Sequence, residues 1–446
     1  MSTALRLKTI NAIDFIGKSF YINQDNVELT YLHDSKIKKM KTTDVSLFSV
    51  LTYLSKGKQI CSGPYGSGKT TTIEAVASIF ESFPLEIVSE ALLRCNPQLT
   101  EEKMLGRPDL GALNKGIEKV IWSYFSLFPS NLIDEFNRMG EDKQILLLDA
   151  IDRGNFKYLN EMIKKNGATY ATTNGLDGGN IELLPSIEDR FSIEVEFVPA
   201  IGFINYINGA KKIISDENIS EKMREKIKKN NSLEEVLELQ KEFQSKRKEL
   251  VFSLEEKEDV FREIDEIGIS EGARNYINYV HCEAGFDSQN GYKGQPKNDS
   301  RNHDLPYLMN SLKNKSGLSP RWLKAITSYS KSLAWLKGEK EVSPETIKAV
   351  LPYTLLHKLK PEINLERGVL ETNKTSNAKK ICSQIHGRFM KDMVHFENFA
   401  GLMKNNSLAL EKKLEKINEW NESHHPMFAF YKAYKLKEMT GDYGKA

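Results

Sequence analysis

The sequence has few cysteines and no long apolar run, and both absences narrow the possible classes of protein. Neither a zinc ribbon nor a C-x-x-C redox motif fits its four widely spaced cysteines, Cys61, Cys95, Cys282 and Cys382. We expect them to be reduced, buried thiols. No stretch of about 18 apolar residues occurs, so a membrane-spanning helix is not expected. Residues 1–16 lack the apolar core and cleavage site of a signal peptide, which predicts a cytoplasmic location.

A charge excess of one sign is also missing. The 63 basic and 61 acidic side chains leave a formal net charge of +2. Binding to nucleic acid through bulk electrostatics needs a clear positive excess, so the composition argues against a nucleic-acid partner. What the chain does have is a globular composition, with 40% hydrophobic and 28% charged residues. Its 446 residues are enough for two or three domains of about 100–200 residues each.

Four zones of the chain differ in residue pattern, and we expect them to be separate domains. Residues 1–57 mix short apolar runs with lysines and form a lead-in segment. Residues 58–199 alternate strand-like and helical runs, which is typical of an α/β layered fold. Residues 200–360 have mostly helical spacing, and residues 361–446 form a helical C-terminal extension with several aromatic residues. Within the third zone, the Gly-, Asn- and Ser-rich residues 284–304 predict an exposed loop.

A glycine-rich loop carries the strongest functional signal. Residues 63–70, GPYGSGKT, fit the pattern G-x-x-x-x-G-K-[ST], between a strand-like run and the helical spacing of Thr71–Phe80. Such glycines let backbone N–H groups surround a β-phosphate, while Lys69 reaches the β- and γ-phosphates and the Thr70 hydroxyl ligates Mg²⁺. The strand–loop–helix context argues against the alternative, a Gly-rich turn with no nucleotide. We predict contacts to a nucleoside triphosphate from nine residues: Gly63, Pro64, Tyr65, Gly66, Ser67, Gly68, Lys69, Thr70 and Thr71.

An acidic pair and a polar strand end complete a hydrolytic site. Asp134 and Glu135 follow Leu-Ile, about 65 residues after the phosphate loop. We expect Asp134 to hold Mg²⁺ at the end of a strand, and Glu135 to be the general base that activates the attacking water. A surface turn is the alternative for this pair. A second strand, Thr169–Asn174, would let Asn174 position the water, and its alternative is an ordinary Asn-Gly turn with Gly175.

Two arginines are candidates for contact with the γ-phosphate. Arg190 lies in the segment Ser186–Phe191 and could serve a neighbouring subunit as an arginine finger, with a surface ion pair as the alternative. Arg321 follows Ser319 and Pro320, which predict the cap and the first position of a helix. The helix dipole does not favour a basic residue in the first turn, which is consistent with recruitment of Arg321 for phosphate contact. We expect both arginines to act in catalysis.

The order of these motifs resembles that of the MoxR family of AAA+ ATPases. These belong to the branch with an insertion in the second helix, alongside magnesium-chelatase ATPase subunits. The phosphate loop is similar to Walker A, and Leu132–Glu135 is similar to Walker B. Thr172–Asn174 resembles sensor 1, Leu184–Phe191 resembles the arginine-finger box, and Gly317–Arg321 resembles sensor 2.

The resemblance extends over roughly residues 20–360. It places the insertion at Glu86 to about Asp109, and a hairpin at Asp152–Asn160. Thr-Asn-Gly stands where the family usually has Gln-Asn-Pro, and residues 361–446 match no domain of the family.

The resemblance implies an α/β P-loop NTPase core of the AAA+ type with a parallel sheet, an all-α lid and a helical C-terminal extension. It implies that ATP binds with Mg²⁺ between the subunits of a ring, with six as the expected number, and that Arg190 completes the neighbour's site. It further implies remodelling, assembly or metal insertion of a client protein, with a von Willebrand factor A domain protein as candidate partner.

Two alternatives stay open. The first is a nucleic-acid-linked or restriction-type AAA+ NTPase motor, against which the near-neutral charge argues. The second is an assembly protein that binds ATP but barely hydrolyses it. The presence of Glu135, Asn174 and Arg190 together argues against this second alternative.

Overall fold

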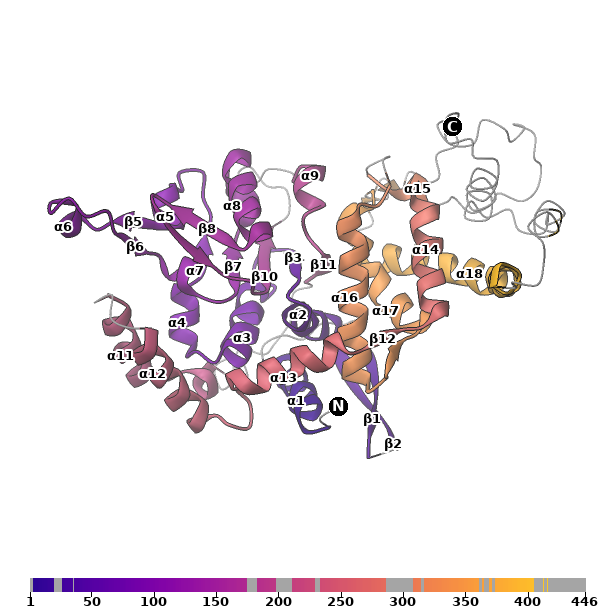
Figure 1. Ribbon diagram of the computed structural model, residues 1–446, viewed down its shortest axis with the longest axis horizontal. Helices are drawn as coiled ribbons and strands as arrows, with labels where there is room; N and C mark the ends of the chain where they lie inside the picture. The colour runs from indigo at the N-terminus through magenta and orange to yellow at the C-terminus, as the bar shows by residue number, and fades with distance from the viewer. Residues whose placement is uncertain are drawn as a thin grey trace. The chain divides into compact units, whose positions relative to one another are not determined.

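The computed structural model shows an α/β unit and a mainly helical unit (Figure 1). It describes residues 3–19, 26–34, 36–174, 183–197, 211–228, 233–285, 308–313, 317–360, 363–364, 369–370, 374–404, 412 and 415. The first unit comprises residues 1–268 and 327–341, and the second comprises residues 269–326 and 342–446. The domain divisions predicted after residues 57, 199 and 360 rest on sequence motifs and stay predictions.

The first unit is built on a five-stranded parallel sheet. The strands follow the order β11-β3-β10-β7-β4, and every neighbouring pair runs parallel. Consecutive apolar residues such as Leu132 and Ile133 are buried, as expected for strands that are covered on both faces. Because the strands are parallel, their carboxyl ends meet at one edge of the sheet, where ligands of such sheets bind. The strands are β3 Lys58–Ser62, β4 Leu93–Arg94, β7 Asn131–Asp134, β10 Thr169–Thr173 and β11 Ile193–Glu196.

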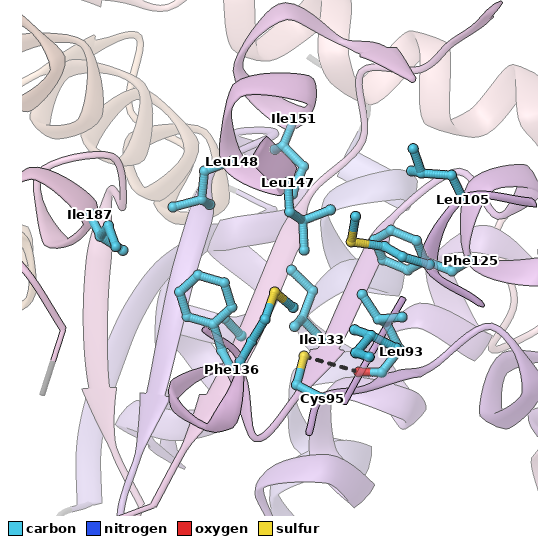
Figure 2. Close-up of a cluster of buried hydrophobic side chains, with 14 of the residues drawn as sticks. Leu93, Cys95, Leu105, Phe125, Ile133, Phe136, Leu147, Leu148, Ile151 and Ile187 are labelled. Carbon is cyan, nitrogen blue, oxygen red and sulfur yellow. Dashed lines mark hydrogen bonds between the residues drawn. The ribbon is translucent and has the colours of Figure 1, made fainter. Parts of the chain in front are cut away.

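Helix α8 (Glu141–Arg153) covers one face of the sheet through a large apolar cluster (Figure 2). Its apolar side chains lie against Ile133 of β7. Phe136, which follows β7, belongs to the same cluster and meets the ring of Phe191 edge-on, with 5.7 Å between ring centroids. Because Phe136 comes directly after Glu135, its burial anchors the segment that carries the carboxylate pair.

Helix α3 (Lys69–Glu81) covers the other face. The buried neighbours of the cluster residues, such as Cys61 and Leu132, point to this side because side chains alternate along a strand. Helix α3 contacts β7 and β10, and it presents apolar residues at helical spacing, including Ile73 and Val76. Helix α2 (Asp44–Leu54), in which every residue is buried, packs against α3, β3 and β11. The helix that begins at the phosphate loop therefore packs against both the sheet and α2.

Two antiparallel hairpins interrupt the α/β pattern. One pairs β8 (Asn155–Tyr158) with β9 (Glu161–Lys164), so the hairpin predicted at Asp152–Asn160 covers only its first half. The other pairs β5 (Gly106–Pro108) with β6 (Val120–Trp122) and carries helix α6 (Leu110–Leu113) between its strands. Glu161 joins the two hairpins, since its carboxylate accepts hydrogen bonds from the backbone of Val120 at 2.9 Å and from the indole of Trp122 at 3.2 Å.

The prediction that Glu86 to about Asp109 form one insertion is wrong, because this segment contains a strand of the central sheet. Strand β4 pairs with β7, with Leu93 opposite Ile133. Two residues are too short to show an apolar pattern, so periodicity did not reveal this strand. The additional hairpin, β5–β6, begins only afterwards and extends beyond Asp109.

The remaining elements of the first unit surround this core. Two short strands, β12 (Gly268–Ile269) and β13 (Glu341–Val342), lie where the chain passes between the units. The other elements are α1 Thr3–Ser19, β1 Asn26–His33, β2 Lys36–Thr43, α4 Leu85–Glu90, α5 Glu101–Met104, α7 Tyr124–Leu127, η1 Phe136–Arg138, α9 Pro185–Glu188, α11 Glu217–Lys228, α12 Leu233–Lys246 and α13 Leu254–Asp265.

The second unit is mainly helical, and helices α14, α17 and α18 pack against one another. Arg388 of α18 donates hydrogen bonds at 3.0 and 2.8 Å to the buried carboxylate of Glu283 in α14. Helix α16 belongs partly to each unit. The elements are α14 Glu271–Gly285, α15 Leu308–Ser311, α16 Pro320–Lys337, α17 Pro344–Leu355, η2 Leu356–Lys358, β14 Ile363–Asn364, β15 Val369–Leu370 and α18 Lys374–Lys404.

Helix α18 lies in the predicted helical extension, residues 361–446. Most of the remainder of that extension, and most of the loop predicted at residues 284–304, lie outside the described residues. In the described segments, no helix combines the length and the apolar character that a membrane crossing needs.

A buried carboxylate at the end of α3 connects four elements of the first unit. Glu81 accepts hydrogen bonds from Ser130 at 2.5 Å and from Tyr53 at 3.2 Å, and it forms an ion pair with Lys257 of α13 at 3.5 Å. The amide of Gln240 in α12 donates to its backbone carbonyl at 2.6 Å. Because both charged groups are buried, each depends on the other for neutralisation.

We predict that Lys257→Met lowers the free energy of unfolding by about 3 kcal/mol, because it leaves the Glu81 carboxylate buried without its cation. Adding Glu81→Gln should recover part of the loss, since the amide is neutral and still forms hydrogen bonds. Lys246→Met, which breaks exposed ion pairs on α12, is the matched control and should cost under about 1 kcal/mol. Urea unfolding measures all three, and a double variant as unstable as the sum of its parts would contradict the prediction.

Candidate nucleotide-binding and hydrolytic site

The phosphate loop joins β3 to α3 and depends on its glycines. Gly63, Gly66 and Gly68 have φ of +143°, +73° and +81°, values that other residues rarely adopt. A Cβ on Gly63 would also lie 2.2 Å from the carbonyl oxygen of Phe197, just after β11. Gly68 begins helix α3 without a capping side chain, so the first backbone N–H groups of the helix are available to an anion.

Lys69 places its ammonium inside this loop. Its Nζ donates hydrogen bonds at 2.7 Å to the carbonyl oxygens of both Gly63 and Pro64. The side chain is buried, and burial lowers the pKa of Lys69 from its ordinary value. Phosphate oxygens in the loop would offer this ammonium charged acceptors, which form stronger hydrogen bonds than carbonyls do.

Asp134 brings two hydroxyl groups together at the carboxyl end of β7. Its Oδ1 accepts a hydrogen bond from Thr70 at 3.0 Å and another from Thr172 of β10 at 2.6 Å. Thr70 and Asp134 are therefore close enough to bind one cation. Both supply oxygen atoms, the ligand type that Mg²⁺ prefers, so the residues fit this metal.

Glu135 is the next residue after Asp134, and its backbone has a strained conformation. Its φ of +55° is rare for a residue with a side chain. The conformation is stabilised by a 2.9 Å hydrogen bond from its N–H to Thr172 Oγ1 and by the short helix η1, which begins at the next residue. Its Oε1 accepts a hydrogen bond from Asn174 Nδ2 at 3.2 Å, and its Oε2 pairs with Arg138 Nη1 at 3.2 Å. The predicted base and the predicted water-positioning residue are thus in direct contact.

Asn174 is buried, and both its backbone and its side chain form hydrogen bonds within the site. Its carbonyl oxygen accepts a hydrogen bond at 3.0 Å from the side chain of Asn137, two residues beyond Glu135. Hydrogen bonds therefore connect Thr70, Asp134, Thr172, Glu135 and Asn174 at one edge of the sheet, and Lys69 precedes Thr70 in the chain.

Of the two arginines predicted for the γ-phosphate, Arg190 contacts the acids of α8, and Arg321 belongs to the second unit. Arg190 Nη1 lies 3.4 Å from Asp152 Oδ2 and 3.9 Å from Asp149 Oδ1, both on α8. Asp152 also pairs with Lys58. Arg321 lies in the first turn of α16, as predicted, but in the second unit. The catalytic roles of Arg190 and Arg321 stay predictions.

Arg138 and Thr172 complete the network, but the sequence analysis assigned neither of them a role, although Thr172 begins the segment that resembles sensor 1. Thr172 lies two residues before Asn174 on β10, so strand alternation puts both side chains on the same side. That pattern is a signal that could have identified Thr172. Arg138 contacts Glu135 three residues back and Tyr65 of the phosphate loop, whose hydroxyl accepts from Nη2 at 3.0 Å. No sequence spacing indicates the second of these contacts.

Comparison with known proteins supports the architecture. The model of the AAA lid domain family matches residues 308–378. A structure of a provisionally assigned ATPase from Cytophaga hutchinsonii is similar with a TM-score of 0.53 at 16% identity, over 84% of this chain and 94% of that chain. A full-length MCM homolog from Methanopyrus kandleri gives a TM-score of 0.39 at 11% identity, over 71% of this chain and 55% of that chain. No match was found among curated proteins.

The chain therefore has the fold of an AAA+ ATPase: a parallel α/β core, an AAA lid domain and a helical C-terminal region. This confirms the predicted fold class, an α/β P-loop core with a parallel sheet followed by an all-α lid and a helical extension. At 16% identity the structural likeness shows the fold alone.

We predict that Gly63→Ala destabilises the first unit by about 3 kcal/mol and abolishes tight nucleotide binding, because the new Cβ would displace the loop from Phe197. Gly116 is the control for a positive φ without a steric clash, since its φ is +75° in the β5–β6 hairpin and no atom lies within 4 Å of an added Cβ. Gly116→Ala should cost about 1 kcal/mol of backbone strain and leave nucleotide affinity unchanged. Equal losses in urea unfolding would show that backbone strain alone, without the steric clash, accounts for the effect.

Proposed function

We propose that this chain is a Mg²⁺-dependent ATPase. The observation that carries the proposal is the pair of contacts around the acidic residues, in which Asp134 accepts from Thr70 of the phosphate loop and Glu135 accepts from Asn174. An acidic pair in an ordinary surface turn would not need either contact. Hydrolysis of a bound triphosphate requires a metal-binding pair of residues beside a positioned general base, and these two contacts provide that arrangement.

Each residue then has a role that follows from its place. The loop N–H groups and Lys69 bind the phosphates, and Thr70 and Asp134 would hold Mg²⁺, which would supply positive charge to stabilise the phosphoryl oxygens. Glu135 accepts the proton of the attacking water, and Asn174 orients that water and the carboxylate. Binding closes the loop around the nucleotide, so the base meets only water that lies in line with the γ-phosphate.

We further propose that the chain works as a MoxR-like ring, with six subunits as the expected number, that remodels or assembles a client protein or inserts a metal into it. The match of residues 308–378 to an AAA lid domain supports this, because a lid that moves against a core is the usual way to convert hydrolysis into motion. In such a ring Arg190 reaches the neighbour's γ-phosphate and Arg321 senses it from the lid. A von Willebrand factor A domain protein is the proposed partner.

We expect Lys69→Ala to abolish tight ATP binding, since it removes the cation from the loop. Glu135→Gln should bind ATP normally and lower turnover by about a hundredfold or more, because the amide cannot accept a proton. A fluorescent-nucleotide titration beside a phosphate-release assay separates the two effects. Turnover in Glu135→Gln as fast as in the wild type would exclude Glu135 as the base.

Arg190→Ala should bind ATP but lose turnover, because the finger acts on the neighbouring subunit. Mixed with Lys69→Ala at equal amounts, it should regain activity at about a quarter of the interfaces, where an intact loop faces an intact arginine. The matched control is Arg153→Ala, which removes an exposed arginine that also pairs with Asp149 and should leave turnover unchanged. A mixture as inactive as its components would argue against action between subunits.

A further inference from the structure

The carboxylate of Glu135 is held at both of its oxygens by donors from different elements. Asn174, after β10, donates to Oε1, and Arg138, in η1, pairs with Oε2. The terminal torsion of a glutamate side chain is broad, so a single contact would leave the carboxylate plane free to rotate. Two donors on opposite oxygens define that plane, and with it the direction in which a lone pair meets a water molecule.

Arg138 has a second partner outside its own segment. Its Nη2 donates a 3.0 Å hydrogen bond to the hydroxyl of Tyr65, which lies 73 residues earlier in the chain. Tyr65 is the third residue of the phosphate loop, and it is 52% exposed. The planar guanidinium, with its two terminal nitrogens in fixed geometry, therefore spans the gap between the loop and the base.

We propose that Arg138 is a positioning residue that couples the phosphate loop to the base: Tyr65 orients the guanidinium, and the guanidinium orients the Glu135 carboxylate. This inference rests on the proposed ATP hydrolysis. It means that the loop conformation that accommodates the triphosphate also sets the geometry of the base, so water is activated only when the loop is correctly closed.

An ordinary surface ion pair would not have this arrangement. Exposed pairs three residues apart contribute under about 1 kcal/mol and need no third group. Here the acid has a left-handed backbone with a φ of +55°, which turns its side chain toward both donors at a cost in strain. Lysine could not replace the arginine fully, because an ammonium is a point charge that cannot bridge two partners in fixed directions.

The experiment compares Arg138→Met, Arg138→Lys and Tyr65→Phe with the wild type. We expect Arg138→Met to lower kcat about tenfold, and Tyr65→Phe about threefold, with ATP affinity within about twofold of the wild type in both. Arg138→Lys should fall between Arg138→Met and the wild type. The thermal midpoint of each variant shows whether a loss of kcat merely follows a loss of stability. Arg153→Met, at an exposed ion pair on α8, is the control for removing an arginine.

The double variant decides whether Tyr65 acts through Arg138. Tyr65→Phe should have no further effect on kcat once Arg138→Met is present, because the link is already broken. Independent, multiplying losses would overturn the coupling, and an Arg138→Met kcat within twofold of the wild type would overturn the positioning role. A wild-type protein that binds ATP without hydrolysing it would instead refute the proposed function, and this inference with it.

Discussion

The site depends on one carboxylate oxygen that accepts hydrogen bonds from two hydroxyl groups. Asp134 Oδ1 binds Thr70, at the start of α3, and Thr172, in β10. These three residues come from three segments that only a parallel sheet brings to the same edge. The Thr172 hydroxyl also accepts a hydrogen bond from the N–H of Glu135, so one hydroxyl group positions both Asp134, the proposed metal ligand, and Glu135, the proposed base.

The segment after β7 shows how binding and anchoring residues alternate. Asp134 contacts Thr70 and Glu135 contacts Asn174, while Phe136 is buried in the cluster against α8. Asn137 then donates to the backbone of Asn174, and Arg138 reaches Tyr65. Because each residue has its own partner, the strained backbone at Glu135 persists: the packing of Phe136 and the hydrogen bonds around it offset the cost of the left-handed conformation.

Sequence patterns anticipated the elements that are continuous and failed for those that are short. The loop, α3 and β10 each show their pattern within a few turns or residues, so periodicity and motif spacing were enough. Strand β4 has two residues, and its place next to β7 depends entirely on pairing with a strand far along the chain. The second half of the β8–β9 hairpin was missed because β9 has only four residues, and its two apolar residues, Met162 and Ile163, are adjacent and do not alternate with polar ones.

The phosphate loop, the acidic pair and the class of fold could be predicted from the amino-acid sequence, because they depend on residues that are neighbours in the chain. Glycine spacing dictates a backbone that can wrap a phosphate whatever surrounds it. The contacts between distant side chains became visible only in the folded chain: Thr172 with Asp134 across 38 residues, Tyr65 with Arg138 across 73, and Arg190 with the acids of α8. Those contacts depend on strand register and on the direction of each side chain, and both are set by packing of the whole core.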